Sequence, residues 1–175
     1  LELYLDLERP LTESELECLR VLVRRRGQRE PLQYILGECH FCDCALSVDA
    51  RALIPRPETE GLIERVLPRL PGASQILDLG TGSGAIALAL AQAIVKTGVS
   101  ANSAPVITAT DRSAESLKLA EANRDRLGLS TQVDLLQSDW FEAIESGACF
   151  DIILSNPPYL TEEEYAVAEA EVKNY

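Results

Sequence analysis

The stretch Ile76-Leu77-Asp78-Leu79-Gly80-Thr81-Gly82-Ser83-Gly84 joins a short apolar segment to a turn rich in glycine. The apolar segment predicts a buried strand, and the almost wholly apolar run at 85–95 predicts a helix after the turn. Glycines permit positive φ angles and let a ligand approach the backbone, while the N-terminus of the next helix offers amides to a carboxylate or phosphate. The stretch therefore predicts a strand, a ligand-binding turn and a helix.

The alternation of strand and helix continues beyond this stretch. Further strands are expected at 106–110, 133–136 and 150–154, with a helix at 113–127 and a surface loop at 96–105. Strands that alternate with helices indicate a mainly parallel sheet with right-handed crossovers, and ligands then lie at the carboxyl ends of the strands. The predicted fold class is therefore α/β.

The residues before the sheet predict a helical segment and a hairpin. Thr12 and Glu15 have the spacing of a capping box, and a stripe of apolar residues follows at helical spacing. Two extended stretches at about 38–46 and 50–54, with a turn at 47–49, predict a β-hairpin. A segment stiffened by two prolines then leads to a helix that is expected to begin at Glu58.

The composition is that of a soluble globular protein, with 46% hydrophobic and 25% charged residues in 175. No apolar run approaches the roughly 20 residues that a membrane-spanning helix needs, and no secretory leader opens the chain. The net charge of −12 argues against a duplex nucleic acid as partner, because phosphate binding depends on clustered Lys and Arg. The arginines at 24–26 are interpreted as the solvated end of a helix.

The five cysteines predict a reducing, cytoplasmic environment, because their number is odd and no export signal accompanies them. The segment Cys39-His40-Phe41-Cys42-Asp43-Cys44 contains metal-ligand residue types, but it also alternates as a strand does. No second pair of cysteines lies elsewhere to complete a tetrahedral zinc site. A hairpin strand is therefore expected here, and no metal site.

The ends of the second and third strands carry candidate nucleoside-binding residues. Asp111 is placed to bind the two hydroxyls of a ribose, with a solvated strand-end carboxylate as the alternative. Asp139 offers an acceptor for an adenine amino group, and Trp140 a flat surface beside it. The alternative for Trp140 is a core position, where its indole NH would need a buried partner.

The fourth strand ends in Asn156-Pro157-Pro158-Tyr159. The prolines stiffen this corner and cannot continue a sheet ladder, so its carbonyls are available to a ligand. An Asn carbonyl oxygen and a peptide carbonyl that point together would receive a planar NH2 group. Gly80, Gly82 and Ala85 also satisfy the pattern of nicotinamide enzymes, which keeps a dehydrogenase open. A nucleoside site beside an NH2 receptor nevertheless favours S-adenosylmethionine over NAD.

These motifs resemble those of Rossmann-like methyltransferases that modify planar nitrogens. The segments Glu30-Pro-Leu-Gln-Tyr-Ile-Leu-Gly-Glu38 and Leu53-Ile-Pro-Arg-Pro-Glu-Thr-Glu60 look more narrowly like the family that N5-methylates the glutamine of the Gly-Gly-Gln motif in peptide chain release factors. The resemblance covers essentially the whole chain. It implies a partial helical substrate-recognition domain at 1–33, a linking hairpin at 34–55 and a methyltransferase domain at 56–175.

The resemblance also implies roles for the residues at the strand ends. Asn156 and the carbonyl of Pro157 would accept both hydrogens of the substrate amide, next to Pro158, while Tyr159 would pack against the amide plane. The product of the cofactor would be S-adenosylhomocysteine. The residues expected to bind S-adenosylmethionine are Asp78, Gly80, Thr81, Gly82, Ser83 and Gly84 around the methionine end, Asp111 at the ribose, Asp139 and Trp140 at the adenine, and Asn156.

Members of this family are longer at both ends than this chain. We therefore expect a fragment with a sheet and methyltransferase domain that are incomplete at the C-terminus, weakly active or inactive alone. The expected partner is a release factor, met by a cytoplasmic monomer without direct nucleic-acid or membrane contact. The alternatives are an amino-methyltransferase that acts on adenine or guanine in a nucleic acid, and a truncated binding module without catalysis.

Overall fold

The central element of the fold is the strand that precedes the glycine turn. In the computed structural model, which describes residues 9–98 and 104–157, this strand has a neighbour on each side in a four-stranded sheet of order β5-β4-β3-β6. All three pairings are parallel, as the sequence predicted. The strands are β3 (Gln75–Leu79), β4 (Val106–Asp111), β5 (Val133–Gln137) and β6 (Ile152–Ser155).

The strand order places a topological switch point between β3 and β6. The chain moves outward from β3 to β4 and β5 on one side and then crosses to β6 on the other side. In parallel sheets, a crevice opens where the strand order reverses, at the carboxyl ends of the two strands. The glycine turn follows β3 and Asn156 follows β6, so both lie at this crevice.

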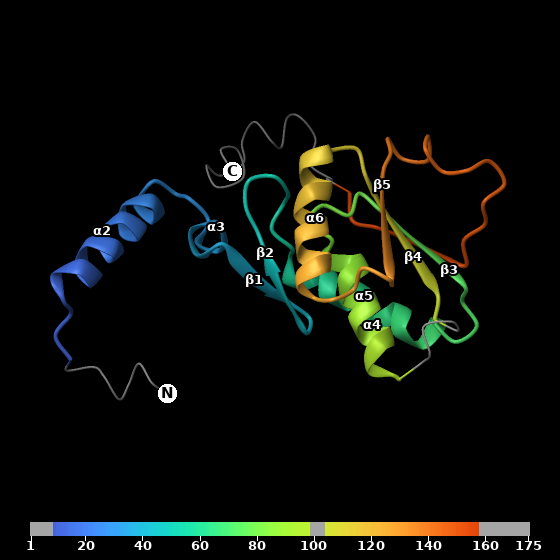
Figure 1. Ribbon diagram of the computed structural model, residues 1–175, viewed down its shortest axis with the longest axis horizontal. Coiled ribbons are helices and arrows are strands. Elements are labelled where there is room, and N and C mark those ends of the chain that lie inside the picture. The colour runs from blue at the N-terminus through green and yellow to red at the C-terminus, as the bar shows by residue number, and fades with distance from the viewer. Residues whose placement is uncertain (1–8, 99–103, 158–175) are drawn as a thin grey trace.

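Two crossover helices, α5 (Ala85–Lys96) and α6 (Ala114–Arg126), pack against β4 and β5 (Figure 1). The first turns of α5 are buried on nearly every side, which explains why its sequence is almost continuously apolar. Ser113 caps α6, because its side chain accepts a hydrogen bond from the amide of Ser116 at 3.2 Å. Both helices begin within a few residues of the carboxyl end of a strand.

The hairpin differs from the prediction in the position of its turn. Its strands are β1 (Glu38–Phe41) and β2 (Cys44–Ser47), paired antiparallel, and residues 50–54 form no strand. The chain reverses at Cys42 and Asp43, where the sequence predicted the middle of a strand. The prediction was wrong because a two-residue turn usually contains Gly or Asn, and here neither is present.

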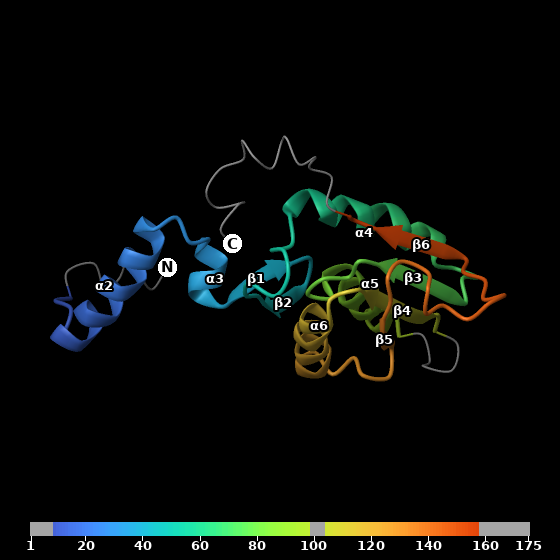
Figure 2. The same cartoon turned by 90° about the horizontal axis from the view of Figure 1, so that it is seen from above.

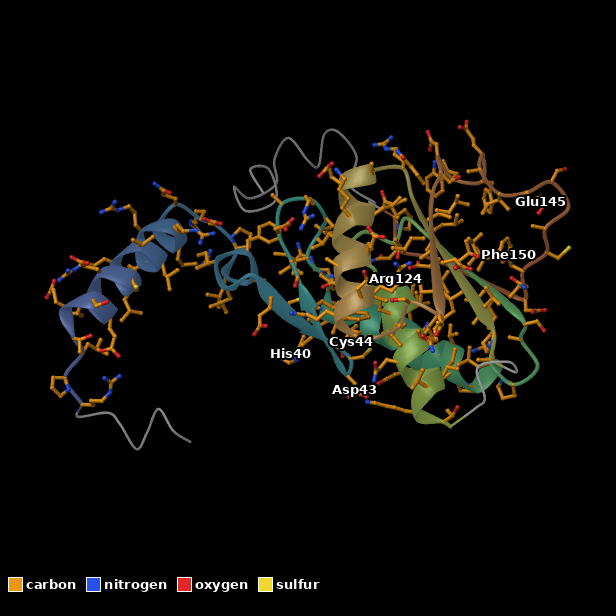
Figure 3. All side chains as sticks on the ribbon, viewed as in Figure 1. His40, Asp43, Cys44, Arg124, Glu145 and Phe150 are labelled. Carbon is orange, nitrogen blue, oxygen red and sulfur yellow. The ribbon has the colours of Figure 1, made fainter. Side chains whose placement is uncertain are left out.

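Distant contacts hold this unusual turn in place. Cys42 has a φ of +48°, and its amide donates to Oε1 of Glu60 at 2.9 Å. Asp43, at the tip of the hairpin in Figure 3, accepts a hydrogen bond from Nζ of Lys96 at 2.7 Å. Both partners belong to helices, so the turn is stabilised by tertiary contacts that no local pattern shows.

Asn123, on α6, ties the hairpin to the glycine turn. Its side chain is fully buried, and its Oδ1 accepts from the amide of Ser47 at 2.7 Å. Its Nδ2 donates to the carbonyls of Ser47 and Ser83, each at 3.0 Å. One side chain thus fixes the end of β2 against the turn that follows β3.

The N-terminal helix α2 (Glu13–Gly27) lies apart from the sheet, beyond α3 (Leu32–Leu36) and the hairpin (Figures 1 and 2). The predicted capping box is present: Glu15 donates its amide to Thr12 Oγ1 and accepts from the amide of Thr12. No residue of α2 is buried. Domain boundaries at 33 and 55 stay a prediction.

Within the described ranges, the structure contains no helix that is both long and apolar enough to cross a bilayer.

Candidate active site

The glycine turn has the conformation that the sequence predicted for it. Gly80, Gly82 and Gly84 have φ angles of +72°, +57° and +86°. The amide of Thr81 donates to the carbonyl of Thr110 at 2.8 Å, which anchors the turn to the end of β4. The turn is therefore anchored at the crevice, and its backbone has φ angles that residues other than glycine rarely adopt.

The three glycines serve different purposes. A Cβ added to Gly80 would have no neighbour within 4 Å, so this position is open. A Cβ on Gly82 would lie 3.7 Å from that of Ala52, in the segment after the hairpin. A Cβ on Gly84 would lie 2.9 Å from Cδ1 of Leu88, so glycine at 84 allows close packing of the turn on the helices.

Asp78 lies beneath the turn and is completely buried. Its Oδ2 accepts a hydrogen bond from Oγ1 of Thr81 at 2.7 Å, whereas Oδ1 has no hydrogen-bond partner among the described residues. Burial raises the pKa of Asp78 to about 6, and the negative charge of Asp111 adds to the rise. The hydrogen bond from the hydroxyl of Thr81 lowers this pKa in part. The amide of Ala87 also lowers the pKa, although it lies outside hydrogen-bonding geometry.

Asp111 ends β4 and fixes the turn from the side. Its Oδ2 accepts from the amide of Gly82 and its Oδ1 from the amide of Ser113, each at 2.9 Å. The carboxylate is partly exposed. Each carboxylate oxygen has a second lone pair, so these bonds leave acceptor capacity on Asp111 for a ligand hydroxyl.

Asp139 and Trp140 follow β5 as predicted, and both are exposed. Trp140 is 57% exposed, so the core position considered for it is wrong. Its φ is +50°, and its carbonyl accepts a hydrogen bond from Oγ of Ser138 at 2.9 Å. The amide of Ser138 donates to the carbonyl of Asp111 at 3.0 Å, which brings the ends of β4 and β5 together.

Asn156 lies directly after β6 at the other side of the crevice. The preceding Ser155 pairs with Leu79, and its hydroxyl donates to the carbonyl of Leu79 at 2.9 Å. Asn156 and Gly80, the next residues of the two strands, therefore lie at the same level of the sheet. Nδ2 of Asn156 donates to Oγ1 of Thr59 at 3.1 Å.

Two cavities meet at Asn156. One, of about 70 Å³, lies between the glycine turn and the segment after the hairpin. The other, of about 320 Å³, lies between the end of β6 and residues 56–62. Arg56, Thr59 and Asn156 line both. The smaller cavity is also lined by Phe41, Leu53, Ile54, Pro55, Gly80, Thr81, Gly82, Ser83, Ala85 and Ile86, and the larger by Glu58, Leu62 and Ser155.

Of the predicted site residues, Gly80, Thr81, Gly82, Ser83 and Asn156 line one cavity. Neither cavity is lined by Asp78, Gly84, Asp111, Asp139 or Trp140. Pro157 is exposed at the end of the described part. The predictions for Pro158 and Tyr159 lie outside the described residues.

The wall supplied by residues 53–59 was missed by sequence reasoning as part of the site. The helix expected from Glu58 is a 3-10 turn, η1 (Pro57–Thr59), followed by α4 (Glu60–Val66), which η2 (Leu67–Arg69) prolongs. The high density of proline and charge in this segment was the available signal. The segment lines the cavity only because the fold brings it next to Asn156, which lies 97 residues after Thr59.

The chain is similar along its length to curated release factor glutamine methyltransferases. It is 42% identical to that of Chlorobaculum tepidum, over 100% of this chain and 60% of the relative. It is 38% identical to that of Rhodopirellula baltica, over 100% and 58%. The chain thus spans about 60% of the length of the curated relatives that it matches.

Solved structures support the fold. The N-terminal domain of human METTL16 in complex with SAH aligns over 75% of this chain and 54% of its own, with 18% identity and a TM-score of 0.54. Human methyltransferase 10 domain containing protein aligns over 76% and 60%, with 19% identity and a TM-score of 0.53. These likenesses confirm the predicted Rossmann-like methyltransferase architecture.

Two family descriptions match the chain. Residues 1–37 match the PrmC N-terminal domain. Residues 72–174, more than half of the chain, match the methyltransferase domain family and include the sheet, the glycine turn and Asn156. The chain therefore belongs to the methyltransferase domain family.

Proposed function

We propose that the protein which carries this chain transfers a methyl group from S-adenosylmethionine to the side-chain amide of the glutamine in the Gly-Gly-Gln motif of a release factor. The observation that carries this proposal is the cavity shared by the glycine turn and Asn156 across the β3/β6 switch point. The glycine turn and Asn156 follow adjacent strands there, which supports a cofactor at the turn and a substrate amide at Asn156.

The turn fits a cofactor that carries a carboxylate. The position of Gly80 is open, and the cavity is lined by Ala85 and Ile86, at the start of a helix whose first amides have no intrahelical acceptor. The residues that would hold the cofactor are Gly80 to Gly84 at its methionine end, supported by Asp78, and Asp111 at its ribose. Asp139 and Trp140 would bind its adenine from the end of β5. When bound, S-adenosylmethionine supplies a methyl group on a positively charged sulfur.

The chemical difficulty is that an amide nitrogen is a poor nucleophile, because its lone pair is delocalised into the carbonyl. Asn156 Oδ1 and the Pro157 carbonyl would accept the two hydrogens of the substrate NH2. Two acceptors orient the nitrogen and stabilise the positive charge that grows on it during transfer. Tyr159 would pack against the amide plane next to Pro158. The proton then leaves to solvent, since this scheme assigns no general base.

The choice of substrate rests on the relatives, whose names state that they act on release factors. We extend this to the present chain because the match runs through residues 1–37 as well as the methyltransferase domain. In this proposal, residues 1–33 contact the release factor, residues 34–55 link the two parts, and residues 56–175 bind the cofactor. The protein would act as a monomer in the cytoplasm, without direct contact to nucleic acid.

Asn156→Ala tests the assigned chemistry. We expect methyl transfer to a release factor to fall at least about 100-fold, since one acceptor for the developing charge is lost. The affinity for S-adenosylmethionine, measured by calorimetry, should change by less than about tenfold, because Asn156 is one of several residues expected to bind the cofactor and the turn is untouched. Ser130→Ala, a surface change, serves as control.

Undiminished transfer by Asn156→Ala would refute the role of Asn156. Radiolabelled methyl in RNA or DNA, and not in the release factor, would replace the proposed function with the nucleic-acid alternative. Absence of cofactor binding, with retained binding to a release factor, would favour the non-catalytic module.

A further inference from the structure

Thr59 occupies the N-cap of α4 but does not act as a cap. Its side chain makes no capping hydrogen bond, although Thr at this position normally accepts from an amide of the first turn. The preceding 3-10 turn continues directly into α4, and Thr59 has helical angles, φ −72° and ψ −20°. The hydroxyl is therefore not needed to begin the helix.

The hydroxyl contacts Asn156 instead. Oγ1 of Thr59 accepts a hydrogen bond from Nδ2 of Asn156 at 3.1 Å, across 97 residues of chain. Both residues are partly buried and line both cavities. Among the described residues, no donor contacts Oδ1 of Asn156, so the bond to Thr59 engages the donor end of the amide and leaves the acceptor end available.

We propose that Thr59 is a positioning residue that holds the Asn156 amide at the cavity, with Nδ2 engaged and Oδ1 available to accept from a substrate NH2 group. This inference rests on the proposed function and deepens it.

The physical reason is that a partly buried amide group is held in place when one of its ends has a partner. Oγ1 of Thr59 satisfies a hydrogen of Nδ2, so the amide is fixed at the cavity while Oδ1 stays available. Without the hydroxyl, Nδ2 would lose this partner and the amide would turn more freely about its last bond.

The test compares Thr59→Val, which keeps the shape and removes the hydroxyl, with Thr59→Ser, which keeps the hydroxyl. We expect Thr59→Val to lower kcat for a Gly-Gly-Gln peptide about tenfold, the value of roughly one hydrogen bond, because the acceptor amide is held less firmly. KM should rise less than kcat falls, and Thr59→Ser should restore both. Thr97→Val, which removes the hydroxyl that contacts the carbonyl of Ile94, is the matched control.

A second readout does not depend on catalysis. The side-chain NH2 resonances of Asn156 in an amide-correlated NMR spectrum should shift in Thr59→Val and keep their wild-type positions in Thr59→Ser and Thr97→Val. Unchanged Asn156 resonances in Thr59→Val would overturn the proposal, and so would an unchanged kcat. If the wild-type protein transfers no methyl to a release factor, the proposed function fails, while the resonances still decide whether Thr59 orients the amide.

Discussion

A buried carboxyl group beneath the glycine turn makes the stability of the fold sensitive to pH. Asp78 is enclosed on all sides, and only one of its oxygens has a partner among the described residues. Its pKa is raised from 3.8 to about 6, chiefly by burial. A carboxyl with a raised pKa binds its proton more tightly in the folded state than in the unfolded chain. The contribution of Asp78 to stability therefore falls as pH rises.

We predict that this loss occurs between about pH 4 and pH 6 and amounts to roughly 3 kcal/mol, after which the contribution is constant. Asp78→Asn keeps the shape of the side chain and cannot ionise. Urea titrations across this range measure the free energy of unfolding of both proteins. As pH rises, the value for the variant should increase relative to that of the wild type.

Asp151 provides the control, because its pKa is shifted in the opposite direction. Its exposed carboxylate accepts hydrogen bonds from the amides of Ser74 and Gln75, which lower the pKa below 3.8. The stability that the Asp151 carboxylate contributes is present above its unfolded pKa and is lost as pH falls below it. Asp151→Asn removes this contribution, so the variant should still lose stability between pH 4 and 6 as the wild type does. If Asp78→Asn showed the same decline as the wild type, the assignment to Asp78 would be wrong.

At the scale of elements, the packing of the glycine turn on its helices depends on the absence of a side chain at Gly84. A Cβ there would lie 2.9 Å from Cδ1 of Leu88 and 3.3 Å from Cβ of Ala120. Leu88 and Ala120 are 1% and 0% exposed, so they have little room to move. Gly72 has nearly the same φ, +87° against +86°, but open space around it.

We predict that Gly84→Ala destabilises the protein by about 1 to 3 kcal/mol more than Gly72→Ala, because both substitutions strain the backbone and only the first also overpacks the core. Urea titrations at neutral pH measure both values. Equal losses would show that the helices adjust to a methyl group at this place, and that Gly84 is required only for its φ.

The elements that the sequence predicted well are those whose signal is local. The apolar run at 85–95, the capping box of Thr12 and Glu15 and the glycine turn each determine their own structure within a few residues. The hairpin turn at Cys42 was missed because its bonds go to Glu60 and, through Asp43, to a helix end. Thr59 was missed for the same reason, since its hydroxyl has its role only beside a residue distant in sequence.

At the scale of the whole molecule, net charge is the dominant electrostatic feature. The chain carries 28 acidic and 16 basic residues, a formal charge of −12 at pH 7. Self-repulsion of this kind destabilises a compact state, and salt screens it. Several ion pairs, such as Lys118–Glu115 and Arg20–Glu13, are exposed, so their loss in salt costs little.

We therefore predict that raising NaCl from 10 mM to 500 mM increases the thermal midpoint by about 2 to 5 °C. KCl at the same concentrations should act equally, because screening depends on ionic strength and not on the cation. A midpoint that falls with salt would mean that attractive pairs outweigh the net repulsion.

The hydrogen bond between Thr59 and Asn156 also has a consequence for the order in which parts of the protein fold during synthesis. Its two residues are 97 positions apart, and the bond from Ser155 to Leu79 spans 76. Contacts across such long loops form only after both segments are available. During synthesis, the glycine turn emerges from the ribosome long before the strand that completes its crevice. The crevice between the glycine turn and Asn156 therefore forms only after β6 has left the ribosome.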